Sequence, residues 1–235
     1  MPENPLLPNR KLRELHALIE RCRDLDRRQP RAPAREALLA ATTMQLLPGD
    51  VLLAEPGDRA AATLAPQPKS RTAAATPPIP SISVAAAMAA GLQSAAAAAG
   101  ARAGVVLAFA SAGLAEPGWP AALEWANTAH LPLILCCADA TGGKLARTGR
   151  APAPALTWPN LDRVATKLRL PTLAVDGEDA VAVYRVMQES VIRARAGGGP
   201  AVIWAVLSPQ RPAGTQRPLA RLRSYLLSRR ISLPR

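Results

Sequence analysis

The chain has 235 residues, a formal net charge of +12, and a composition that is 49% hydrophobic but only 3% aromatic. This length suffices for one domain with a sizeable core. The three cysteines form no CxxC motif, so a disulfide framework and a zinc site are both disfavoured. No apolar signal region stands at the start of the sequence, which predicts a cytoplasmic protein.

Arginine carries most of the positive charge, and residues 210–235 contain seven arginines and no acid. This pattern fits a solvated basic face, and it also fits a surface for an acidic partner or a nucleic acid. The sequence disfavours a nucleic acid as partner, because it has no known binding motif and few aromatic residues that could stack on bases.

Helices and short apolar runs alternate along the chain. Residues 1–9 are expected to be a flexible N-terminus, and residues 55–80 an irregular, Pro-rich segment. Residues 82–101 are uncharged, but they are mostly alanine, which is barely favourable in lipid, so they predict a buried helix and no membrane span. Helices are expected at 10–28, 34–47, 84–99, 120–130, 161–168, 180–196 and 219–230. Strands are expected at 51–54, 105–109, 133–137, 172–175 and 201–206.

The stretch 105–139 organises the rest, because it reads as a strand, a helix and a second strand, which is one βαβ unit. In open α/β sheets, ligands bind in the loops where such strands end. Here those loops carry Ser111 and Gly113 after the first strand, and Asp139 and Ala140 after the second. Alternating strands and helices predict a doubly wound, mostly parallel α/β sheet in a single domain, residues 10–230, followed by a tail, 231–235.

Three segments together resemble the alpha subunit of the thiamine-diphosphate-dependent first component of 2-oxo acid dehydrogenase complexes. The C-terminal third is the closest, with VDGEDAVAVYRVMQESVIRARAGGGPAVIWAV and then RPLARLRSYLL. Upstream, REALLAATTMQLLPGDVLLAEPGDR is similar to another run of the family, and 105–139 is similar to the unit that holds its metal. The resemblance covers nearly the whole chain and implies the thiamine-diphosphate-binding fold.

The resemblance also implies where magnesium and thiamine diphosphate would bind. The acid of the family's G-D-G falls on Ser111, and the second asparagine of its N-N falls on Ala140, with Asp139 at the first. Its Y-R-x-H motif falls on 56–59, and its late histidine on Ala213. Glu116 matches a family glutamate and is interpreted as an acid at the start of a helix. A serine hydroxyl is a weak magnesium ligand and an alanine methyl is none.

These departures predict that the chain has no catalytic residues and no metal site, and that it needs no cofactor. The first hypothesis is a non-catalytic structural or regulatory subunit, whose partner is a second copy or a beta-type subunit of the same family. The second is an active oxidative decarboxylase subunit whose site is rebuilt around Asp139, Ser111 and a backbone carbonyl. The third is a binding module whose Arg-rich C-terminal segment takes an acidic or nucleic-acid ligand.

Overall fold

The computed structural model describes residues 7–26, 35–54, 59–64, 81–140, 155–207 and 217–232. Within these ranges five strands form one sheet in the order β1-β2-β3-β5-β4, and every neighbouring pair is parallel. The strands are β1 (Val51–Leu53), β2 (Val106–Ser111), β3 (Leu133–Asp139), β4 (Thr172–Asp176) and β5 (Ala201–Val206). The predicted doubly wound α/β fold is confirmed.

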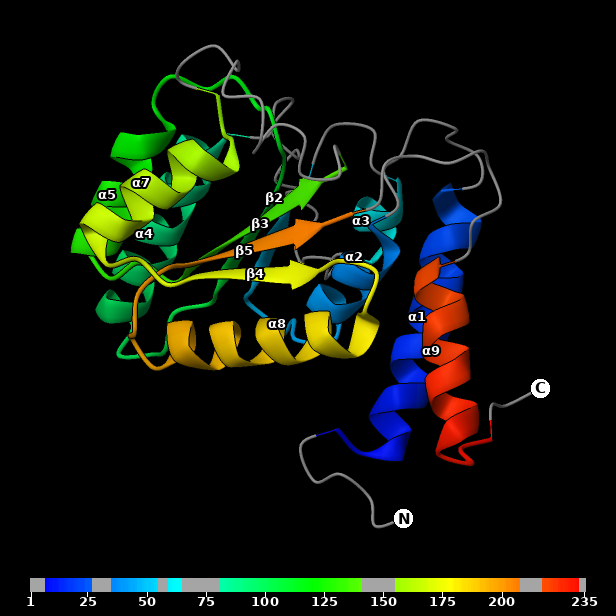
Figure 1. Ribbon diagram of the computed structural model, residues 1–235. Helices are drawn as coiled ribbons and strands as arrows, with labels where there is room; N and C mark the ends of the chain where they lie inside the picture. The colour runs from blue at the N-terminus through cyan, green and yellow to red at the C-terminus, as the bar shows by residue number, and fades with distance from the viewer. Residues whose placement is uncertain are drawn as a thin grey trace.

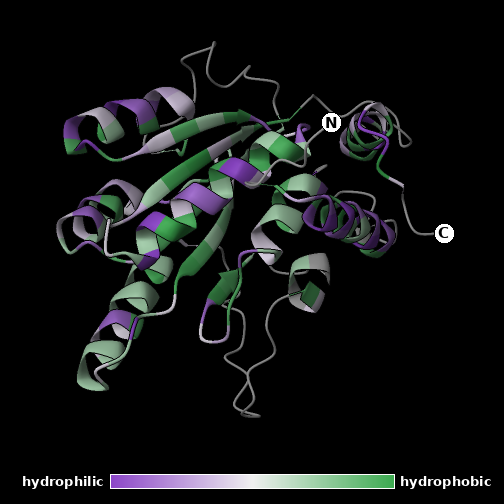
Figure 2. Cartoon of the chain, turned by 90° about the horizontal axis from the view of Figure 1, so that it is seen from below, coloured by the Kyte–Doolittle hydropathy of each residue, from purple (hydrophilic) through white to green (hydrophobic). Residues whose placement is uncertain are grey.

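Helices cover both faces of the sheet (Figure 1). One face packs against α4 (Ile82–Ala98), α5 (Trp119–Thr128) and α7 (Trp158–Leu168). The other packs against α2 (Glu36–Thr43) and α8 (Ala180–Arg195), beside which α1 (Asn9–Asp26) and α9 (Arg217–Ser228) lie together. Figure 2 shows the strands coloured mainly as hydrophobic, while the hydrophilic stretches lie on the helices.

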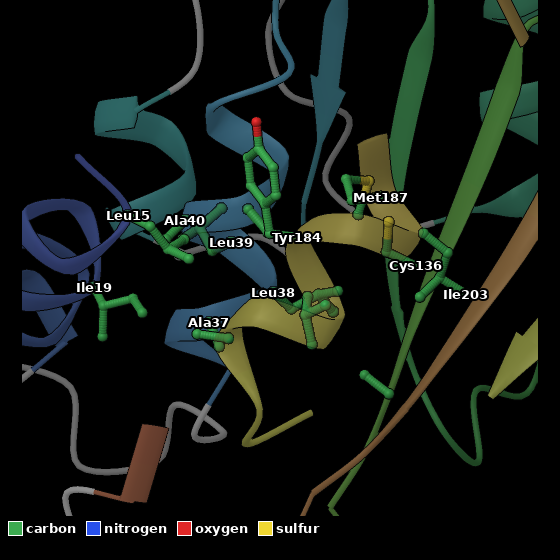
Figure 3. Close-up of a cluster of buried hydrophobic side chains, with 14 of the residues drawn as sticks. Leu15, Ile19, Ala37, Leu38, Leu39, Ala40, Cys136, Tyr184, Met187 and Ile203 are labelled. Atoms are coloured by element: carbon green, nitrogen blue, oxygen red, sulfur yellow. The ribbon is translucent and has the colours of Figure 1, made fainter. Parts of the chain in front are cut away.

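Strand β3 is the centre of the sheet, and all seven of its residues are buried. Because successive side chains point to opposite faces, Cys136 belongs to the core under α8 and Cys137 to the core under α5. Figure 3 shows Cys136 beside Met187 and Ile203. Burial raises the pKa of the Cys136 thiol to about 12 and raises that of Cys137 as well. Both thiols are therefore protonated packing groups, as the apolar run around them predicts.

The boundaries of several elements differ from the sequence-based expectations. The helix expected at 34–47 ends at Thr43, where the Thr42 and Thr43 hydroxyls bond the carbonyls four residues back. Helix α7 begins at Trp158 and not at 161, because a proline in its first turn is compatible with a helix start. The irregular segment expected at 55–80 is wrong in part, since Arg59–Leu64 forms α3.

Two of the expected segments lie mostly outside the described residues. Most of the expected flexible start lies outside the described residues, and within them Leu7 is buried and Asn9 begins α1. The loop expected after β3 lies mostly outside them too, since 141–154 are not described. Among the described residues, no helix is long and apolar enough to cross a membrane.

Asp50 fixes the turn before β1 to the start of β2. Its buried carboxylate accepts hydrogen bonds from the Leu47 amide at 2.7 Å and the Val105 amide at 2.8 Å, and it forms an ion pair with Arg195. The two backbones approach so closely that a Cβ on Gly104 would lie 2.0 Å from the Gly49 carbonyl oxygen. One carboxylate thus joins the first two strands to the end of α8.

Replacing Asp50 with alanine should therefore lower the free energy of unfolding by about 3–5 kcal/mol, because the partly buried Arg195 loses its ionic partner and the buried Val105 amide loses its acceptor. Urea unfolding followed by circular dichroism measures the change. The matched control is Asp162→Ala on the exposed face of α7, which should change stability by less than about 0.5 kcal/mol. Equal effects of the two substitutions would contradict this role for Asp50.

Candidate functional site

The sheet has a topological switch point between β3 and β5. The chain leaves β2 and β3 toward α5 and α7 on one face, whereas it leaves β4 and β5 toward α8 and α9 on the other. Adjacent strands whose connections diverge in this way open a crevice outside their carboxyl ends, where ligands bind in α/β sheets. Asp139 and Val206, the paired last residues of β3 and β5, mark this place.

The loop residues singled out from the sequence come together at this edge. Ser111 ends β2 opposite Ala138, and the amide of Ala112 donates to the Ala138 carbonyl at 2.9 Å. Gly113 adopts a φ of 91°, a conformation that favours glycine, and its amide donates to the Leu156 carbonyl at 2.8 Å. Ala140 follows Asp139 directly. Their role as positions of a former cofactor site stays a prediction.

Asp139 is the only carboxylate among those four residues, and its side chain belongs to the core. The residue is 1% exposed, and its Oδ2 accepts a hydrogen bond from the Trp204 Nε1–H at 3.3 Å. Trp204 is itself buried in β5 and meets Trp158 edge-to-face at 5.6 Å. Sequence reasoning missed this pair, although a tryptophan within the apolar run AVIWAV is a signal, since a buried indole N–H needs an acceptor.

Glu116 caps a helix, but not the one that follows it in the chain. Its carboxylate accepts from the amides of Ile82 at 2.7 Å and Ser83 at 3.0 Å, and from the hydroxyls of Ser81 and Ser83. These groups form the first turn of α4. The acid expected to start the following helix therefore joins the loop before α5 to the start of α4. Burial alone would raise the pKa of Glu116, but the hydrogen bonds from Ser83, Ile82 and Ser81 outweigh it and lower that pKa.

Replacing Glu116 with alanine should cost about 1–2 kcal/mol of stability at neutral pH, a typical value for a lost helix cap. Because the folded state lowers the pKa of Glu116, its contribution is complete above the ordinary value of 4.5 and is lost as the pH falls through the folded pKa. Urea unfolding of both proteins between pH 7 and pH 3 measures this.

The difference in stability between wild type and Glu116→Ala should therefore shrink toward acid pH. Glu124→Ala, on the exposed face of α5, is the matched control and should show no such trend. A difference that is the same at every pH would contradict the capping role of the ionised carboxylate.

The two histidines lie away from the carboxyl ends of the strands. His16 on α1 accepts from the Arg223 Nε–H of α9 at 3.1 Å, and its Nδ1 lies 3.4 Å from Glu20. Burial lowers the pKa of His16. His130 follows α5 at the opposite edge of the sheet, just before β3.

Other positions implied by the resemblance cannot be placed. Residues 55–58 and Ala213 lie outside the described residues, and the side chain of Arg59 is not described. Across the described part of the chain, no three His, Cys, Asp or Glu residues are grouped so as to hold a metal ion.

Comparison with known proteins identifies the family. The family model described as "Dehydrogenase E1 component" matches residues 67–207, more than half of the chain. A search of the curated proteins found no match.

Among solved structures, benzoylformate decarboxylase from Polynucleobacter necessarius is similar with a TM-score of 0.48 and 12% identity, over 79% of this chain and 35% of that one. A candidate thiamin diphosphate-dependent enzyme from Mycobacterium smegmatis is similar with a TM-score of 0.49 and 14% identity, over 77% of this chain and 33% of that one. The chain thus spans about a third of the length of each. By the family match, the chain belongs to the dehydrogenase E1 component family.

Proposed function

We propose that this chain is an alpha-like subunit of a 2-oxo acid dehydrogenase first component that does not bind magnesium or thiamine diphosphate. It acts as a structural or regulatory subunit, assembled with a second copy of itself or with a beta-type subunit. The observation that carries the proposal is the position of Asp139, whose carboxylate is enclosed in the core and bonded to Trp204.

The chemistry of the residues at the strand ends supports the proposal that the chain does not bind magnesium. Magnesium requires near-octahedral oxygen ligands and is held by carboxylates and substrate or cofactor phosphates. Ser111 supplies a neutral hydroxyl and Ala140 supplies a methyl group. Turning Asp139 outward would leave the buried indole N–H of Trp204 without its acceptor, at a cost of about 1–3 kcal/mol. The described residues at this edge therefore do not fit the metal, and no catalytic step follows from them.

The scaffold, in contrast, is intact around these positions. The parallel sheet, the cap of α4 by Glu116 and the tie of Asp50 to Arg195 all link segments far apart in the chain. Asp179 likewise caps α8 by accepting from the amides of Val181 and Ala182. A chain that keeps its fold while the strand-end ligands differ from the family's is suited to assembly and not to chemistry.

Calorimetric titration of the purified full-length protein with thiamine diphosphate and magnesium should give no saturable binding in the micromolar range. The variant Ser111→Asp/Ala140→Asn should not restore binding, because the family's arginine and histidine positions also differ here. Saturable micromolar binding by the wild type would overturn the proposal in favour of an active subunit with a rebuilt site. Recovery in the double variant would contradict this account of the site.

The assembly can be tested separately. Affinity purification of the tagged chain from its native cell, followed by mass spectrometry, should yield a beta-type first-component subunit or the untagged chain itself. Recovery of neither partner under low-salt conditions would contradict a role as a subunit.

A further inference from the structure

A cavity of about 670 Å³ lies between the first turns of α8 and the neighbouring face of α9. It lies on the face of the sheet that α8 covers, and its lining includes neither Asp139 nor Val206 of the crevice between β3 and β5. Its volume falls in the range of small-molecule sites, about 300–1,000 Å³. The polar side chains that line it are Asp179, Arg185, Arg221, Ser224, Tyr225 and Arg229.

Three arginines and one acid line this cavity, so the lining has a net positive charge. That acid, Asp179, already accepts two amide hydrogen bonds at the start of α8 and lies 3.6 Å from Arg221. Arg221 also donates to Asp176 at 2.6 Å, and this bond raises the pKa of the guanidinium. The acids therefore hold Arg221 in place and do not neutralise the other two arginines.

Arg185 and Arg229 remain as charges for a ligand. Within the described residues, neither forms an ion pair with an acid. Arg229 is held over the ring of Tyr225, with the guanidinium carbon 4.9 Å from the ring centre, which orients its N–H groups in advance. Arg185 lies on α8 and Arg229 directly follows the end of α9, so the two charges come from the two sides of the cavity.

We propose that this cavity between α8 and α9 binds a small organic polyanion that carries at least two carboxylate or phosphate groups. Guanidinium groups bind both kinds of anion through paired hydrogen bonds, and the hydroxyls of Ser224 and Tyr225 add further donors. Ala182 and Leu222 also line the cavity and offer apolar surface to a carbon skeleton. An anion bound here would join α8 to α9.

Isothermal titration of the full-length protein with citrate and, separately, with pyrophosphate, at constant ionic strength, tests this. The wild type should bind at least one of the probes saturably with one site. Arg185→Gln/Arg229→Gln should weaken that binding at least about tenfold, the loss expected for one charge-assisted interaction or more. Arg163→Gln, an exposed arginine on α7, is the matched control and should leave affinity unchanged.

The two probes distinguish the sources of the anion, since citrate reports a carboxylate ligand and pyrophosphate a phosphate ligand. Binding that is equal in wild type and the double variant would overturn the proposal, as would saturable binding of neither probe. Circular dichroism of each variant shows that it is folded. Citrate has no diphosphate group, so its result is independent of whether the strand ends bind thiamine diphosphate.

Discussion

The parallel pairing of β3 with β2 on one side and β5 on the other is the constraint on which the rest of the structure depends. Because β3 is buried along its whole length, every side chain on it must pack into one of the two cores. Its last residue, Asp139, is buried like the rest of the strand, and its carboxylate accepts a hydrogen bond from the Trp204 N–H of the next strand. The carboxyl edge of the sheet is thereby joined to the core.

Carboxylates that accept hydrogen bonds also hold distant segments together around the sheet. Three carboxylates are engaged with backbone amides or arginines: Glu116 with the start of α4, Asp50 with Arg195, and Asp176 with Arg221. Membership of the dehydrogenase E1 component family explains the scaffold. The proposed loss of cofactor binding is consistent with polar groups of this chain that serve the fold.

Much of the architecture follows from local patterns in the sequence. Strand β5 and helix α8 were predictable to within a residue, because Asp179 caps the helix and three glycines separate it from the strand. Strand β3 extends to Asp139, beyond the predicted end at 137, since a polar residue gives no sign of burial. The contacts of Asp139 with Trp204 and of Glu116 with α4 join residues 33 to 65 positions apart, which no local pattern encodes.

The central claim is that Asp139 serves the core and not a metal. Manganese prefers the same oxygen ligands as magnesium, and it broadens the NMR signals of nearby nuclei because it is paramagnetic. Amide spectra of the ¹⁵N-labelled protein, recorded as manganese and thiamine diphosphate are added, therefore test the claim at the level of single residues. The account predicts unchanged signals for Ser111, Asp139 and Ala140. Selective, saturable broadening of these three amides would contradict it.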